Sequence, residues 1–124
     1  MAEEQTLYEK LGGDLAVRAL VIRIYNYILE DDELASFFKY VEVDRLKYSL
    51  IVFVEYALNG PRTYTTEFIR NAHKEPVKQG LTDKHFDLVA DYLAKSMRDT
   101  KMPESAVDYA MARVAERRND VLRR

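Results

Sequence analysis

Apolar residues recur at helical spacing along almost the whole chain. They form successive stripes whose members lie three or four positions apart, which places them on one face of an α-helix. The stripes are Val17, Leu20, Val21, Ile24 and Ile28; Leu46, Leu50, Phe53, Val54 and Ala57; Phe86, Val89, Leu93 and Met97; and Val107, Ala110, Met111 and Val114. No stretch alternates apolar and polar residues over a useful length, so we predict an all-α chain.

Glycine, proline and acidic residues divide this pattern into helices. The expected breaks are Gly12–Gly13, the acidic run 30–33, the loop near Tyr40–Val41, Asn59–Gly60–Pro61, Pro76 with Gly80, and Met102–Pro103. We expect Asp14 to cap the helix after the first break and Thr82 or Asp83 to cap the helix that contains Phe86. Gly60 is expected to take a left-handed conformation at the end of the helix before it.

Length and composition suit one compact domain, 1–124, because 48% of the 124 residues are hydrophobic. The formal charge of −2 argues against nucleic acid as a partner. Cysteine is absent, which excludes disulfides, thiolate zinc sites and a thiol nucleophile. The chain opens with acidic residues and has no apolar run of the ~18 residues that span a bilayer, so we expect no membrane partner and a cytoplasmic location.

A cluster of arginines ends the chain, within the last predicted helix. Cations there meet the negative end of the helix dipole, so we interpret the cluster as a solvated helix end rather than a binding patch. Its members are Arg113, Arg117, Arg118, Arg123 and Arg124.

His73 is the most informative candidate for chemistry. It lies in the short amphipathic segment 68–74, which we expect Pro76 to interrupt, so the imidazole sits near a helix end. An imidazole on an apolar helix face can bind a haem iron from one side while the rest of the face covers the porphyrin. The residue chemistry alone leaves this open, because a lone helical histidine is more often a surface or a satisfied core residue.

Several short motifs follow one another in order. They are 7–13 (LYEKLGG), Phe37–Phe38, Asn59–Gly60–Pro61, the His73 segment and 85–87 (HFD). On these motifs the chain resembles the truncated haemoglobins, most closely the group I branch, over nearly its whole length. The resemblance implies a globin-like fold, a truncated two-over-two helical sandwich around haem. It also implies haem b, a non-covalently held iron protoporphyrin IX, and the absence of cysteine excludes thioether attachment.

The resemblance also assigns roles to single residues. His73 matches the proximal iron ligand, and Tyr25 matches the distal tyrosine. Phe38 matches the phenylalanine that packs on the porphyrin, with Phe37 as the near alternative. Asn59 replaces a glycine of the family's second glycine motif, which asparagine tolerates because it accepts left-handed geometry.

The distal side departs from the common pattern of these proteins. Leu46 and Leu50 stand where many relatives have glutamine or another polar residue, and Ser49 is short and expected to turn outward. Tyr25 is then the obvious side chain to donate a hydrogen bond to bound dioxygen. We expect Tyr25→Phe to speed dioxygen release about tenfold, the loss of one hydrogen bond. A core tyrosine bonded to a backbone carbonyl is the alternative interpretation.

Further residues have weaker assignments. His85 is the only other histidine and is more natural as a helix cap than as an iron ligand. Tyr48 is a remote candidate for the sixth ligand of the iron. An exposed aromatic residue is the more natural interpretation. Phe53 and Val54 either line a route for apolar gases or simply pack in the core. Expected haem contacts also include Ile69, and the expected partners of the haem propionates are Arg45, Lys47, Tyr56 and Arg70.

These residues support three functional hypotheses. The first is a haem protein that reversibly binds dioxygen, carbon monoxide or nitric oxide, as carrier, sensor or scavenger. The second is an enzyme, a nitric oxide dioxygenase that needs an outside reductase, or a haem with weak peroxidase activity. The third is a haem-free globin-like module that works through protein contacts. Monomer or weak dimer is the expected oligomeric state.

Overall fold

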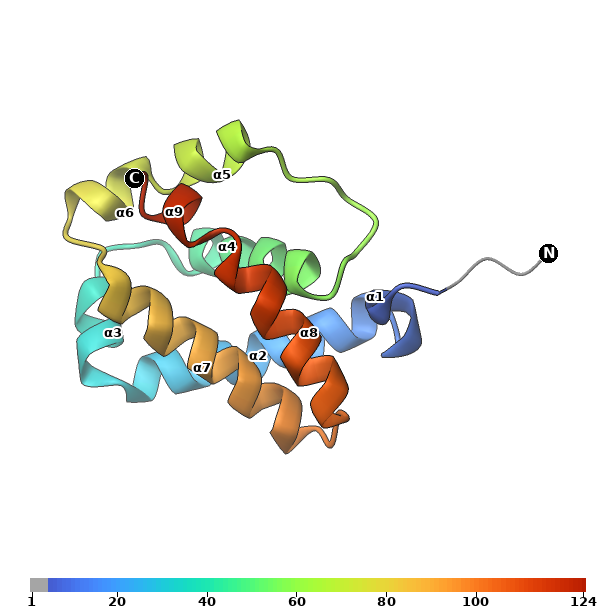
Figure 1. Ribbon diagram of the computed structural model, residues 1–124. Helices are drawn as coiled ribbons and strands as arrows, with labels where there is room; N and C mark the ends of the chain where they lie inside the picture. Colours follow the sequence, from blue (N-terminus) through green and yellow to red (C-terminus); the bar gives the residue numbers. More distant parts are fainter. Residues whose placement is uncertain (1–4) are drawn as a thin grey trace.

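The computed structural model describes residues 5–124, and these residues form helices without any β-strand (Figure 1). The all-α prediction is therefore confirmed for the described part of the chain. The helices are α1 (Leu7–Lys10), α2 (Asp14–Glu30), α3 (Asp32–Phe37), α4 (Val43–Ala57), α5 (Thr66–Ala72), α6 (Lys74–Lys78), α7 (Asp83–Asp99), α8 (Glu104–Ala115) and α9 (Arg118–Val121). No helix among them is long and apolar enough to cross a bilayer.

The four long helices form two packed pairs. Helix α2 packs against α4 and α7, and α8 also packs against α4 and α7. This is the two-over-two arrangement expected from the sequence. The short helices α5, α6 and α9 lie on the far side of α4 from α2 (Figure 1).

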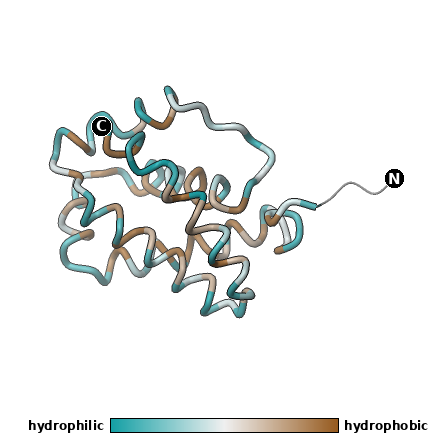
Figure 2. Tube along the Cα trace, viewed as in Figure 1, coloured by the Kyte–Doolittle hydropathy of each residue, from teal (hydrophilic) through white to brown (hydrophobic). Residues whose placement is uncertain are grey.

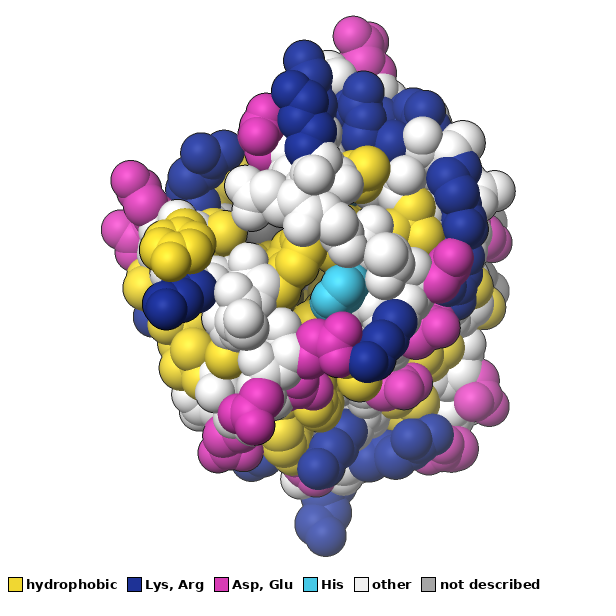
Figure 3. Space-filling view, turned by 90° about the vertical axis from the view of Figure 1, so that its left-hand side faces the viewer, with side chains coloured by type: hydrophobic (Ala, Val, Ile, Leu, Met, Phe, Trp, Pro, Cys, Tyr) yellow, Lys and Arg dark blue, Asp and Glu magenta, His cyan; other side chains and the backbone are white. Residues whose placement is uncertain are grey.

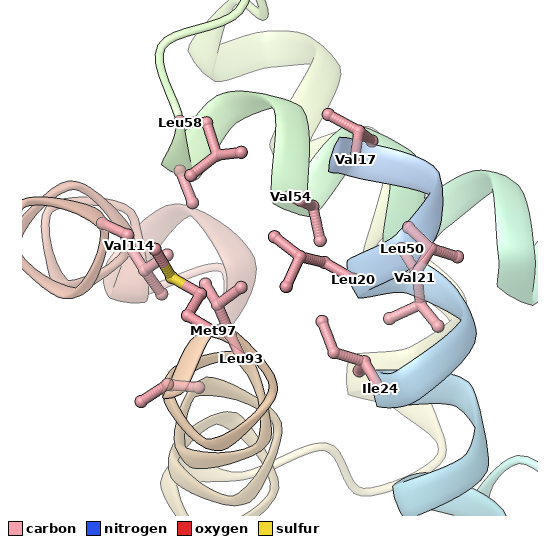
Figure 4. Close-up of a cluster of buried hydrophobic side chains, with 14 of the residues drawn as sticks. Val17, Leu20, Val21, Ile24, Leu50, Val54, Leu58, Leu93, Met97 and Val114 are labelled. Atoms are coloured by element: carbon pink, nitrogen blue, oxygen red, sulfur yellow. The ribbon is translucent and has the colours of Figure 1, made fainter. Parts of the chain in front are cut away.

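The apolar stripes meet between these four helices. Figure 2 shows hydrophobic and hydrophilic residues alternating along the long helices, and Figure 4 shows Leu20 and Ile24 of α2 facing Leu93 and Met97 of α7. All four side chains are fully buried. Truncating one of them, for example Leu20→Ala, leaves a cavity that costs about 2–5 kcal/mol of the free energy of unfolding.

Two helix ends differ from the sequence prediction. Asp14 does not cap α2, because Gly13 takes the cap position with φ of +66° and Asp14 pairs with Arg18 inside the first turn, at 3.0 Å. At the end of α4 the left-handed residue is Asn59, with φ of +59°, and not Gly60. Glycine is needed at position 60 for space, since a Cβ atom there would lie 2.3 Å from Cγ of the buried Glu55.

The arginine cluster is not a solvated helix end. The chain leaves helical geometry after Ala115, and the arginines tie the last segment to other elements. Arg118 binds Asp83 at 3.0 Å and Asp87 at 2.6 Å, and Arg124 also binds Asp83, at 2.8 Å. The predicted single last helix was wrong, because α8 ends at Ala115 and a separate short helix, α9, follows it, with Arg118 paired to α7.

Candidate functional site

A cavity of about 550 Å³ opens between α4 and the short helices α5 and α6, and extends to α7 and α8. This volume is in the range of sites that enclose a small organic molecule or cofactor. Figure 3 shows a histidine ring in a hollow among apolar side chains, with acidic and basic side chains around its mouth. The cavity is therefore mainly apolar inside, with charges available at its edge.

Most of the residues expected to contact a haem lie in the wall of this cavity. They are Phe37, Phe38, Arg45, Leu46, Leu50, Phe53, Tyr56, Ile69 and His73. Tyr25 and Arg70 do not line it. The residues that do line it come from separate helices, α3, α4 and α5 among them, so the fold brings together positions that are far apart in sequence.

His73 sits where two short helices meet. Helix α5 ends at Ala72, His73 is the capping residue between the helices, and α6 begins at Lys74. Pro76 was expected to interrupt the helix, but it lies within the first turn of α6. A proline is tolerated there because the first N–H groups of a helix have no intrahelical partner. The break falls instead at His73 itself.

The imidazole of His73 has one nitrogen engaged and one available. Its Nδ1–H donates to the backbone carbonyl of Ile69 at 2.7 Å, which fixes the tautomer because a carbonyl oxygen can only accept. Burial lowers the pKa of His73, although the bond to Ile69 raises it in part. The side chain is thus neutral near pH 7, and Nε2 keeps its lone pair for a metal ion.

His85 also lines the cavity, but both of its nitrogens are used. Its Nδ1 accepts the backbone N–H of Thr82 at 3.1 Å, at the start of α7, and its Nε2 lies 3.4 Å from the Glu33 carboxylate. Its ring packs on Phe37, with ring centroids 4.8 Å apart. This arrangement agrees with the capping role predicted from the sequence and leaves no free nitrogen for iron.

The side of the cavity formed by α4 is mainly apolar, with Arg45, Ser49 and Tyr56 as its polar members. Leu46 and Leu50 are both buried and line it, while Tyr48 is exposed. Tyr25 of α2 is half-buried against the core, and the ammonium of Lys47 lies over its ring, 5.1 Å from the centroid. Ser49 of α4 also lines the cavity, so the expectation that it turns outward was wrong, and its hydroxyl is a second donor on this side beside Tyr25 of α2.

The cations expected at the cavity edge divide into two groups. Arg45 lines the cavity and is exposed, as a partner for an acidic group requires. Arg70 is engaged elsewhere, because its guanidinium donates to the backbone carbonyl of Arg124 at 3.2 Å and lies 3.8 Å from Asp120. Lys47 lies over Tyr25 instead. Arg45 is thus the one of these three that is available at the cavity.

Sequence reasoning missed several polar residues of the cavity wall, Arg117 and Tyr64 among them. Arg117 lines it and donates from Nε to the Tyr56 hydroxyl at 3.0 Å, and from another nitrogen to Thr66 Oγ1 at 3.1 Å. Tyr64 also lines it, with its hydroxyl buried and without a hydrogen-bond partner among the described residues. Burial raises the pKa of Tyr64, and the nearby Arg62 guanidinium makes no well-formed hydrogen bond to it.

A haem fits this set of groups. The cofactor requires a neutral imidazole on one side, an apolar slot for the ring, and cations or hydroxyls for its two acidic groups. His73 supplies the first, the apolar side chains of the wall supply the second, and Arg45, Tyr56 and Arg117 line the wall for the third.

Comparison with known proteins agrees with this fold and cavity. Residues 6–123 match the bacterial-like globin family. The chain is 37% identical to a group 1 truncated haemoglobin of Synechocystis sp., over 94% of this chain and 97% of that protein, and 31% identical to one of Tetrahymena pyriformis, over 98% of both. The crystal structure of a 2/2 haemoglobin from Synechococcus sp., with covalently attached haem, superposes with a TM-score of 0.85 at 33% identity, covering 97% of this chain and 100% of that one. The chain therefore belongs to the bacterial-like globin family, in its group 1 truncated haemoglobin branch, and its cofactor is haem.

Proposed function

We propose that the chain holds haem b non-covalently, with Nε2 of His73 as the iron ligand, and reversibly binds diatomic gases on the opposite side of the ring. The gases are dioxygen, carbon monoxide and nitric oxide. The observation that carries the proposal is the tautomer of His73, whose Nδ1–H is tied to the Ile69 carbonyl so that Nε2 is left for the metal. Bound haem supplies the iron; the protein orients it and excludes water.

The leucine pair in the α4 wall supports gas binding rather than a permanent second ligand. Leu46 and Leu50 line the cavity and have no atom that could bind iron, and the second histidine is held by Thr82 and Glu33. An iron with one protein ligand keeps a position open for a small molecule. Dioxygen and carbon monoxide also partition favourably into an apolar, water-poor space.

Non-covalent attachment is also supported by the residues in the wall. The chain has no cysteine, and its two histidines are accounted for, His73 by the proposed iron bond and His85 by its capping contacts. A covalent haem such as the one in the Synechococcus structure is therefore not expected here. Haem should leave the protein on extraction with acid and an organic solvent.

Haem titration tests the proposal. Purified protein is titrated with haemin, reduced, exposed to carbon monoxide and followed by its absorption spectrum. Wild type should take up one haem and give the Soret band of a histidine-ligated ferrous carbonyl. His73→Ala should lose that band, and added imidazole should restore it by supplying the missing ligand. His85→Ala is the matched control, and it should keep the wild-type spectrum.

Two results would contradict the proposal. An unchanged carbonyl spectrum in His73→Ala would show that another residue ligates the iron. Failure of the wild-type chain to hold haem would favour the haem-free module. Nitric oxide oxidation is a separate arm of the experiment, in which dioxygen-loaded protein is mixed with nitric oxide. Sustained nitrate production only with a reductase present would favour the dioxygenase hypothesis.

A further inference from the structure

The helix that precedes His73 is held mainly by a later segment of the chain. Helix α5 contacts α9 more than any other helix of the described residues, and the two lie side by side in Figure 1. The Ile69 carbonyl, which orients the His73 ring, belongs to α5. The plane of the imidazole therefore depends on how the segment 118–124 holds α5.

Arg123 binds the last turn of α5. Its guanidinium donates to the backbone carbonyl of Arg70, the residue after Ile69. Carbonyl groups in the last turn of a helix have no intrahelical partner, and a cation there also meets the negative end of the helix dipole. The same carbonyl accepts the backbone N–H of His73 at 3.3 Å. Arg123 thus contacts the peptide group next to the one that fixes the His73 ring.

Arg123 has a backbone conformation that arginine does not favour. Its φ is +57°, in the left-handed region that glycine and asparagine adopt most readily. The turn around it is one in which glycine is the usual residue. In this turn the N–H of Arg124 donates to the Asn119 carbonyl at 2.8 Å, and the N–H of Arg123 donates to the Asp120 carbonyl at 3.3 Å. What arginine adds at this position is its contact with α5.

The other side of the segment 118–124 is anchored to the long helices. Arg118 and Arg124 both pair with Asp83 of α7, at 3.0 and 2.8 Å. Arg70 of α5 turns toward the same segment, with its guanidinium 3.8 Å from the Asp120 carboxylate. The segment therefore joins the helix that precedes His73 to α7.

We propose that Arg123 is a positioning residue for the iron ligand. By holding the last turn of α5 it fixes the Ile69 carbonyl and, through that carbonyl, the His73 ring. The inference rests on the proposed function, in which Nε2 of His73 binds the iron. Arg123 does not line the cavity, so it acts on the iron only through α5. Without its guanidinium the ring is free to turn, which weakens the bond to the iron and the retention of haem.

Two glycine substitutions separate this role from backbone strain. Arg123→Gly removes the guanidinium and the strained conformation together. Lys101→Gly is the matched control, because Lys101 is also left-handed, with φ of +63°, and lies between α7 and α8, far from α5 (Figure 1). Arg123→Lys keeps a cation at the left-handed position and should restore most of the wild-type behaviour.

The iron–histidine stretching band in the resonance Raman spectrum of the ferrous, haem-loaded protein is the first readout. Arg123→Gly should shift or broaden this band and release haem severalfold faster to a haem-scavenging protein. Arg123→Lys and Lys101→Gly should stay near wild type. A wild-type band and release rate in Arg123→Gly, or equal changes in Lys101→Gly, would overturn the proposal.

Proton exchange at His73 is the second readout, and it separates this proposal from the proposed function. The Nδ1–H of His73 is followed by NMR in the ferrous carbonyl protein and in the haem-free chain. It should exchange with solvent severalfold faster in Arg123→Gly than in wild type or Lys101→Gly. Absence of the iron–histidine band from wild type itself would contradict the proposed function, whereas the exchange rate still decides the role of Arg123. Equal exchange in all three proteins would overturn that role.

Discussion

The imidazole of His73 donates its Nδ1–H to the carbonyl of Ile69, one helical turn earlier, at 2.7 Å. The carbonyl is free to accept because α5 ends at Ala72, so that no continuing helix claims it. The end of a short helix thus both orients the ring and selects its tautomer. Since the same residue is half-buried, which lowers its pKa, the neutral form is favoured before any metal binds.

Acidification should destabilise the haem-free protein through His73. Its pKa is lowered from the usual 6.5 by burial, so the unfolded chain takes up the proton first as the pH falls. The free energy of unfolding should therefore decrease below about pH 6.5 and level off below the folded pKa, with a slope of at most about 1.4 kcal/mol per pH unit. His73→Gln should flatten this part of the curve. Urea unfolding at several pH values measures this dependence of the free energy of unfolding on pH. Parallel curves for wild type and His73→Gln would contradict the prediction.

His85→Ala should separate stability from haem ligation. The variant loses the bond from the Thr82 backbone N–H to Nδ1 at the start of α7, and the loss of a helix cap costs about 1 kcal/mol. The unfolding midpoint in urea should fall accordingly, while the carbonyl spectrum of the haem-loaded variant stays unchanged. A changed spectrum with unchanged stability would show that His85 acts on the iron.

Tyr64→Phe should have opposite effects on the haem-free and haem-loaded proteins. The buried Tyr64 hydroxyl lacks a hydrogen-bond partner, and removing such a group is neutral or stabilises by about 1 kcal/mol. If haem supplies the partner, the variant should release haem severalfold faster to a haem-scavenging protein. Phe68→Leu, at the ring that Tyr64 packs against, 5.5 Å away, is the control for lost packing. Equal haem release by wild type and Tyr64→Phe would contradict the role.

The apolar spacing was sufficient to predict the four long helices and their buried faces. Leu20, Ile24, Leu93 and Met97 all lie in the core as the stripes indicate. Helix ends were harder, because a side-chain contact from elsewhere can decide them. Gly60 shows this, since its role depends on the space beside Glu55, and this contact cannot be inferred from local sequence.

The site was predicted best where a residue lies on an inward helix face. Leu46, Leu50 and Phe53 were found in this way, and His73 came from the motif around it. Tyr64 and Arg117 were missed because Tyr64 lies in an irregular loop and Arg117 at a helix break, where no periodicity shows which way a side chain points. A buried tyrosine hydroxyl without a partner is a signal that only a structure provides.

Tyr25→Phe tests the hydrogen bond to bound dioxygen. Tyr25 does not line the cavity, but Ile28, one turn further along the same face of α2, does, and Leu46 and Leu50 line it from α4. The Tyr25 ring is half-buried, and its hydroxyl makes no hydrogen bond to the described residues, so a change of side-chain rotamer would bring it toward the gas.

We expect Tyr25→Phe to raise the dioxygen release rate about tenfold, equivalent to ~1.4 kcal/mol, with little change for carbon monoxide, which carries less charge when bound. Stopped-flow release measures both rates. Lys47→Met is the companion variant, because it removes the ammonium that lies 5.1 Å from the Tyr25 ring centroid and thereby favours the inward rotamer, so dioxygen release should slow. Rates within twofold of wild type for both variants would show that Tyr25 remains outside the cavity, and that the α4 wall alone sets the affinity for dioxygen.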